Sequence, residues 1–315
     1  MFEKIIAKLN EAKTVGIFTH INPDGDAMGS SYALKLVLED MGKTAEVFLC
    51  GGIEDKLSAI VKGVESKNVE IEKCDMLIAL DCADAKRLGK WQDAFTSHAN
   101  TAAIDHHVTH VDFASETVVR DISSTCELMW LLFKEMQAVV SVDAATNIYI
   151  GMATDTGNFK YSSVTGDTHR IAAELIDVGV DFAEVSKRMF DTVTREYLAL
   201  KAKAVNSLKY FGDGRISLLT LKNSDFEEFG VKEENAAGIV TLPTSIEGVE
   251  VGVYIRQRGE SEYKASLRSA RYVDVAEIAE TFGGGGHIRA AGYSVTKEKL
   301  EENIEALIEE IEKRL

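Results

Sequence analysis

The first half of the chain alternates short apolar runs with longer segments of helical periodicity. The apolar runs are TVGIFTH (14–20), TAEVFLC (44–50), DMLIALD (75–81) and TAAIDHH (101–107). Apolar residues recur at helical spacing in 27–42, 123–136 and 142–153. The alternation of strand and helix patterns predicts a mostly parallel α/β sheet with helices on both faces.

The pattern changes near residue 185. A charged helical segment follows. Further strands are then predicted at 215–221, 249–257, 263–269 and 290–295. We therefore expect an α/β domain at 1–185, a linker helix at 186–212 and a smaller α+β domain at 213–315. In the last helix, one face carries only apolar residues, which favours core packing. These are Leu300, Ile304, Leu307, Ile308, Ile311 and Leu315.

Length and composition are those of a globular chain. The 315 residues are 45% hydrophobic, enough for one large or two medium domains with packed cores. No apolar run reaches 18 residues, and the N-terminus lacks the pattern of a signal peptide. The four cysteines are scattered, without a CxxC pair, which fits a reducing compartment. We expect a cytoplasmic protein with no membrane partner.

The net charge of −16 restricts the partners. Proteins that bind long nucleic acid usually carry a basic face, because neutralising phosphates supplies much of the affinity. An acidic chain therefore argues against binding a long duplex. It leaves room for a small phosphorylated substrate in a locally basic pocket.

Carboxylates and histidines gather at successive segment ends in the first half. The segments are FTHINPDGDAMGS with His20, Asp24 and Asp26, LIALDCAD with Asp81, IDHH with Asp105, His106 and His107, and GMATDTGNF with Asp155. Ligands of open α/β sheets bind beyond the carboxyl ends of the strands. A mixed His and Asp set suits Mn²⁺ or a similar ion, and so many donors favour two ions that share a carboxylate.

Each of these residues also has a structural interpretation. His20 could be a satisfied histidine at a strand end, and Asp24, Asp26 and Asp155 could be turn residues. Asp81 could cap the next helix. The two histidines of IDHH could be a surface pair. The joint arrangement favours a site, whereas His98 and His110 lack such a context and are interpreted as ordinary polar residues.

The second half contains four consecutive glycines, Gly283 to Gly286, followed by His287. Glycine lets the backbone approach a ligand closely and present its N–H groups. A strand pattern follows the run, so it is not a Walker A loop, which precedes a helix. Arg268 lies on a nearby strand and offers a planar fork for phosphate. A flexible turn with solvated arginines is the alternative.

Taken together, these segments closely resemble the DHH phosphoesterase family. The resemblance rests on THINPDGDAMGS, ALDCAD, IDHH and GMATDTGNF, and on SLRS and FGGGGHIRAAG of the associated DHHA1 domain. It covers almost the whole chain in the family's order. It implies a two-domain phosphoesterase with two divalent ions, Mn²⁺, at the catalytic centre.

The resemblance also assigns roles to individual residues. One ion would be bound by His20 and Asp24, the other mainly by Asp26, His106 and Asp155, and Asp81 would bridge them. Asp105 would orient a ligand histidine, and His107 would face the scissile phosphate. Substrate would be held by Arg268, Gly284, Gly285, Gly286 and His287.

Within the family, the length and layout resemble the NrnA type. The resemblance implies hydrolysis of short oligonucleotides and of 3′-phosphoadenosine 5′-phosphate (pAp), and a homodimer is common in the family. Three alternatives stay open: a phosphodiesterase for cyclic or linear di-adenylate, an inorganic pyrophosphatase or exopolyphosphatase, and a non-catalytic nucleotide sensor.

Overall fold

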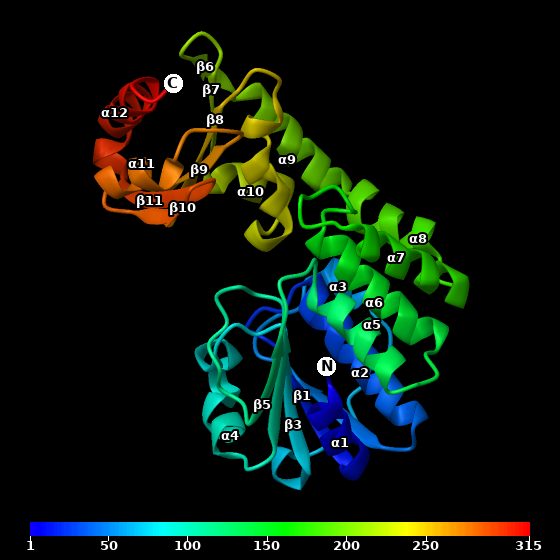
Figure 1. Cartoon of the computed structure of the whole chain (residues 1–315). Helices are drawn as coiled ribbons and strands as arrows, with labels where there is room; N and C mark the ends of the chain where they lie inside the picture. The colour runs from blue at the N-terminus through cyan, green and yellow to red at the C-terminus, as the bar shows by residue number, and fades with distance from the viewer. The chain divides into compact units, whose positions relative to one another are not determined.

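The computed structural model describes residues 1–315, apart from the side chains of Glu234 and Ala237. The chain forms two compact units, Met1–Thr192 and Val193–Leu315 (Figure 1). The segment expected as one linker helix, 186–212, is not a single element. It contains a π-helical turn (Lys187–Asp191) and the separate helix α9 (Arg195–Asn206), whose Leu200 and Ala204 are buried in the second unit. Within the described residues, no helix is long and apolar enough to cross a membrane.

The first unit is built on a five-stranded, fully parallel sheet with the order β2-β1-β3-β4-β5. Its strands are β1 (Thr14–Phe18), β2 (Thr44–Phe48), β3 (Met76–Leu80), β4 (Thr101–Asp105) and β5 (Glu116–Val119). Four of them lie in the predicted apolar runs, and each is shorter at its C-terminal end than the run. The fifth was not predicted, because its four residues are only half-buried and form no apolar run.

Both faces of this sheet are covered, as the sequence predicts. Along β3, Met76, Ile78 and Leu80 face one buried cluster, whereas Leu77 and Ala79 face another. The first cluster packs against α1 (Glu3–Glu11), α2 (Gly25–Asp40), α5 (Thr125–Glu135) and α6 (Val142–Asp155). The second packs against α4 (Gln92–Ser97) and the 3₁₀ turns of Ala85–Trp91. Figure 1 shows α4 on one side of the strands and α1 and α2 on the other. Three further α-helices belong to the unit: α3 (Asp55–Ser58), α7 (Gly166–Val178) and α8 (Phe182–Ser186).

The second unit contains a six-stranded mixed sheet with the order β10-β11-β9-β8-β7-β6. Its strands are β6 (Lys209–Phe211), β7 (Ile216–Leu221), β8 (Val251–Arg258), β9 (Glu262–Ser269), β10 (Gly285–His287) and β11 (Ala290–Thr296). β7 and β8 are parallel, and the other neighbours are antiparallel. The prediction of a smaller α+β unit is confirmed.

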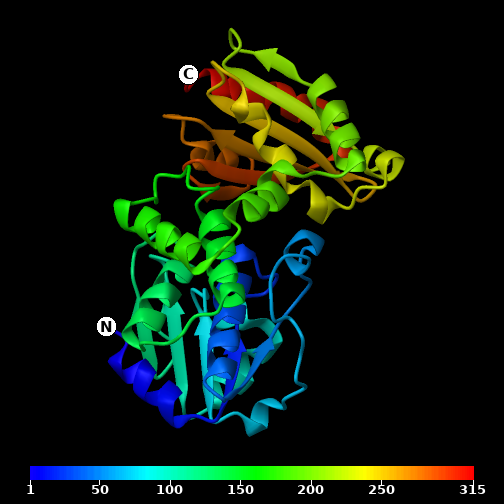
Figure 2. The ribbon, with the colours of Figure 1, turned by 90° about the vertical axis from the view of Figure 1, so that its right-hand side faces the viewer.

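Helices cover the two faces of the second sheet unequally. One face packs against α11 (Val275–Thr281) and α12 (Leu300–Glu312), whose apolar stripe is buried as predicted. On the other face, α9 and α10 (Asn223–Phe229) pack over residues of β7 and β8 (Figures 1 and 2). Beyond them, Lys264, Ser266 and Arg268 of β9 line a surface depression. The unequal cover exposes a polar strip of the sheet.

Candidate active site

Polar side chains lie at the C-terminal ends of three neighbouring strands, at one edge of the first sheet. His20 lies two residues beyond β1, Asp81 directly follows β3, and β4 ends at Asp105, next to His106. The strand order β1-β3-β4 places these ends side by side, at the carboxyl edge where α/β proteins bind ligands.

The start of α2 adds two carboxylates. Asp24 caps the helix, and its Oδ1 accepts from the N–H groups of Asp26 and Ala27, both at 3.1 Å. The fully buried Asp26 in turn accepts from the N–H groups of Thr125 (2.6 Å) and Cys126 (2.8 Å) at the start of α5. Asp24 is therefore a helix cap whose other oxygen, Oδ2, still faces the site, 3.7 Å from His20 Nε2.

Asp81 lies between the two histidines of the site. Its Oδ2 is 3.7 Å from His20 Nε2, and its Oδ1 is 3.6 Å from His106 Nε2. Its backbone is left-handed, with φ of 56°, a conformation that Asp and Asn adopt more readily than other side chains. The next helical turn is capped by Asp84, not by Asp81. Thr125, which the sequence did not single out, donates its hydroxyl to Asp81 at 3.1 Å.

The structure brings together all six residues that were predicted as metal ligands. One group contains His20, Asp24 and Asp81, and a second contains Asp26, His106 and Asp155; within each group the ligand atoms lie within 4.8 Å of one another. Asp81, His106 and His107 form a third such group. Asp155, the last residue of α6, places its Oδ2 3.4 Å from His106 Nε2.

The orientation of the two histidine rings suits a cation in the site. Carbonyl oxygens only accept hydrogen bonds, so His20 Nδ1 donates to Ile21 O (2.9 Å) and His106 Nδ1 donates to Ile122 O (3.1 Å). In the neutral rings, the lone pair of each Nε2 then faces carboxylate oxygens at 3.4–3.9 Å. A divalent cation between these donors resolves the contact, which is the usual arrangement of a metal-binding histidine.

The carboxylates lead to the same conclusion. Burial, reinforced by the nearby Asp24, raises the pKa of Asp81 to about 6. Burial and the charges of Asp81 and Asp155 raise the pKa of Asp26 well above its usual value. Without a cation, these groups lose solvation and repel one another. Imidazole and carboxylate donors suit Mn²⁺ and related divalent ions, so the residues fit the expected metal.

Asp105 was expected to orient a metal-ligand histidine. It contacts His106 through the backbone N–H (2.9 Å), while the His106 ring bonds to the Ile122 carbonyl. Asp105, which is fully buried, accepts from His107 Nδ1 and His110 Nδ1, both at 2.7 Å. The bond to Asp105 raises the pKa of His107.

The structure places His110, which was interpreted as an ordinary polar residue, beside the candidate site. Its side chain is 4% exposed and contacts the same carboxylate as His107. No feature of the sequence distinguishes it from His98, which bonds only to backbone groups.

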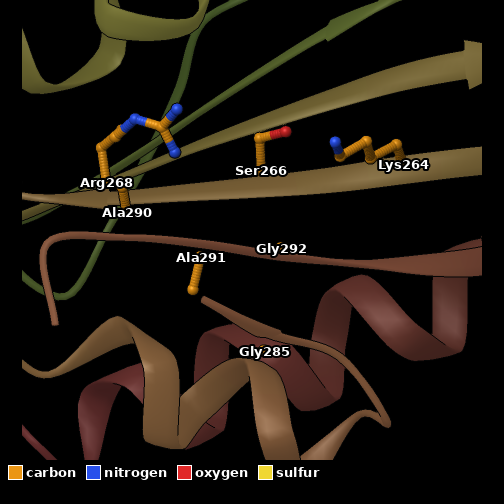
Figure 3. A pocket seen from close by; sticks show the side chains of 7 residues that line it. All are labelled: Lys264, Ser266, Arg268, Gly285, Ala290, Ala291 and Gly292. Atoms are coloured by element: carbon orange, nitrogen blue, oxygen red, sulfur yellow. The ribbon is translucent and has the colours of Figure 1, made fainter. Parts of the chain in front are cut away.

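The second unit contains a separate cationic depression of about 250 Å³. It is lined by Lys264, Ser266, Arg268, Gly285, Ala290, Ala291 and Gly292 (Figure 3). Lys264, Ser266 and Arg268 are alternate residues of β9 and therefore share one face of the strand. Among the described side chains, neither Lys264 nor Arg268 forms an ion pair, and burial lowers the pKa of Arg268. The sequence pointed to Arg268 but missed Lys264.

The glycine run is not one flexible loop. Gly285, Gly286 and His287 form strand β10, which pairs with β11. A Cβ on Gly284 would lie 2.3 Å from Gly292 O, and one on Gly286 would lie 2.5 Å from Ala290 O, so both glycines allow close packing against β11. Gly285 has open space beside it and lines the depression, while His287 is exposed.

This fold and site define a class of protein. The DHH family N-terminal domain matches residues 14–152, and the DHHA1 domain matches residues 216–315. The bifunctional oligoribonuclease and PAP phosphatase NrnA of Thermus thermophilus is 31% identical over 304 residues, which cover 95% of this chain and 89% of that protein. The chain belongs to the DHH–DHHA1 family of phosphoesterases.

Two further similarities are informative. An exopolyphosphatase-related protein from Bacteroides fragilis has a solved structure with a TM-score of 0.87 and 28% identity, covering 99% of this chain and 96% of that one. The cyclic-di-AMP phosphodiesterase PdeA of Listeria monocytogenes is 26% identical over 327 residues, which cover 96% of this chain but 48% of that protein.

Proposed function

We propose that this protein is a divalent-metal-dependent phosphoesterase that hydrolyses short oligonucleotides and pAp, with two Mn²⁺ ions at the edge of the first sheet. The observation that carries the proposal is the position of Asp81, which directs one oxygen toward each of His20 and His106. One shared carboxylate between two donor groups suits two ions a few ångströms apart. The activities named for the Thermus thermophilus relative support the choice of substrate.

When bound, the ions would acidify the attacking water and neutralise charge on the phosphate oxygens. The residues of the chain orient the histidines and supply the proton. Carbonyl oxygens hold the rings of His20 and His106 with Nε2 directed toward the carboxylates with which they would bind the metals. Asp105 holds His107 by Nδ1, which leaves its Nε2 for the substrate. In its protonated form, His107 donates a proton to the leaving oxygen as the ester bond to phosphorus breaks.

The depression of the second unit suits a phosphate group of the substrate. Arg268 offers two parallel donors, and Lys264 adds a compact charge on the same face of β9. Gly285 leaves room for a phosphate to approach the backbone. A small cationic depression on a chain of net charge −16 favours short substrates over long polyanions.

Two other substrate classes have specific support. The Listeria monocytogenes relative is named for cleavage of cyclic di-AMP, so cyclic or linear di-adenylate is a second candidate. The similarity to the Bacteroides fragilis protein makes inorganic polyphosphate a third. All three substrate classes are hydrolysed at a phosphorus atom. They differ in the groups that the second unit must bind.

A side-by-side substrate test decides among them. The purified full chain with Mn²⁺ is given pAp, pApA, cyclic di-AMP, a five-residue RNA, a long single-stranded DNA, pyrophosphate and polyphosphate, and product release is measured. The proposal predicts turnover of pAp and the short RNA but not of the long DNA. A preference for pyrophosphate or polyphosphate would refute the substrate assignment, and no turnover of any substrate would point to a nucleotide sensor.

A further inference from the structure

We propose that His110 is a positioning residue that fixes the catalytic histidine, His107, through the carboxylate of Asp105. The inference rests on the proposed function, in which His107 faces the substrate. It assigns a role to a residue outside the DHH segment itself.

The geometry is a symmetric pair of short hydrogen bonds. Asp105 Oδ1 accepts from His107 Nδ1, and Asp105 Oδ2 accepts from His110 Nδ1, each at 2.7 Å. The carboxylate is completely buried, so water does not substitute for either partner. Oδ1 also accepts from the N–H groups of His106 (2.9 Å) and His107 (3.3 Å), whereas the bond that holds Oδ2 comes from His110.

The surroundings of His110 separate the packing contacts of its ring from the hydrogen bond that it donates. The ring packs against Phe113, with 5.6 Å between ring centroids, and the backbone N–H of His110 donates to His107 O at 3.1 Å. Within the described residues, His110 Nε2 has no hydrogen-bond partner, and Asp112 lies 3.8 Å away. The polar function of this ring is therefore its bond to Asp105.

Removing that bond should loosen His107. The terminal torsion of an aspartate is broad, so a carboxylate held at one oxygen rotates more freely than one held at both. Asp105 Oδ1 would then no longer fix the His107 ring in one orientation and one tautomer. Loss of a residue that orients such a histidine typically costs about 10–100-fold in metal affinity or activity. Because His107 is proposed to act on the leaving group, we expect the loss in turnover.

Three substitutions separate the hydrogen bond from simple packing. In His110→Asn, the amide occupies the place of Nδ1 and keeps a donor for Asp105. In His110→Gln, the amide reaches the place of Nε2 and loses that donor, and His110→Ala removes both. We expect Gln and Ala to lower kcat about 10–100-fold with KM and Mn²⁺ affinity nearly unchanged, and Asn to retain most of kcat.

His98→Ala is the matched control, because His98 precedes β4 and so lies at the opposite edge of the sheet. It should leave kcat unchanged. Equal loss in the Asn and Gln variants would overturn the proposal and assign the ring a packing role, as would unchanged kcat in the Gln variant. If Ala fails to fold, the Asn and Gln pair still decides.

Ring ¹⁵N spectra of the histidines provide a readout that needs no activity. We expect a single Nδ1–H tautomer of His107 in the unmodified chain and in His110→Asn, and a mixture in His110→Gln. Identical His107 spectra in all three would refute the inference. An inactive unmodified chain would refute the proposed function instead, and the spectra would still decide the role of His110.

Discussion

The two units use charge in opposite ways. In the first, Asp26 and Asp81 are buried at the edge of a parallel sheet, where burial and mutual repulsion raise their pKa values. In the second, Lys264 and Arg268 lie on the open part of a sheet face without an ion-pair partner among the described side chains. The first site suits a cation and the second suits an anion.

The two units therefore balance stability against function in different ways. Buried like charges reduce the stability of the metal-free fold, so the first site gains much from its ligand. Lys264 is exposed and Arg268 is half-buried, so both keep part of their hydration and the second site costs the fold little. Substitutions in the two units should therefore affect different measurable quantities.

The largest effect is expected from Asp81→Asn. Asn tolerates the left-handed backbone of this position, so the fold should persist while the shared ligand is lost. We expect kcat to fall more than about 100-fold, beyond the loss typical of residues that only orient a ligand. Asp213→Asn is the control, because Asp213 is exposed and also left-handed, with φ of 55°. Near-normal turnover by Asp81→Asn would contradict the shared-carboxylate proposal.

Metal binding should stabilise the first unit and not the second. At a Mn²⁺ concentration of 100 times Kd, the expected gain is about 2.7 kcal/mol, measured by calorimetry against a sample with EDTA. Asp155→Asn removes one of the crowded carboxylates, and we expect it to raise metal-free stability by about 1 kcal/mol and to reduce the Mn²⁺ gain. If Mn²⁺ stabilised both units equally, the proposal that the metals bind to the first unit would be contradicted.

Arg268→Ala should weaken substrate binding and spare metal binding. Loss of a charge-assisted contact costs about 1.5–3 kcal/mol, which is seen as a rise in KM. Arg268→Lys should be intermediate, because lysine lacks the planar fork. Arg258→Ala is the control on the same sheet, because Arg258 is exposed and pairs with Glu233. The assignment of the depression fails if both alanine variants have the same KM.

Two neighbouring glycines should give opposite results. Gly284→Ala forces a Cβ against Gly292 O and Tyr293, and we expect it to lower the stability of the second unit by about 1–3 kcal/mol. Gly285→Ala meets nothing within 4 Å, so it should leave thermal stability unchanged and raise KM. Thermal unfolding and steady-state kinetics test the pair. A destabilised Gly285→Ala would show that its role is structural.

Much of the fold could be predicted because apolar runs mark buried strands. Four of the five strands of the first sheet lie in such runs, and in three of these runs a histidine or aspartate at the end marks the edge where ligands bind. The gathering of His20, Asp81 and His106 follows from this rule. β5 could not be predicted, because an edge strand of four half-buried residues carries no such signal.

Contacts between distant segments could not be predicted either. Asp26 binds the start of α5, 99 residues along the chain, and nothing in either segment indicates the pairing. The role of His110 depends on a turn that brings it back to Asp105, and the strand pairing of Gly285 depends on β11. Patterns along the chain locate elements, whereas tertiary geometry decides which side chains meet.

Two hydrogen bonds from the start of α5 to Asp26 connect the proposed metal site to this helix. The carboxylate that is proposed to bind a cation also accepts two amide protons in the first turn of that helix. Local opening exposes such amides to exchange with solvent, and its rate depends on how firmly the acceptor is held. The amide hydrogen exchange rates of Thr125 and Cys126 would therefore report whether the metal is bound, and they can be measured without any substrate.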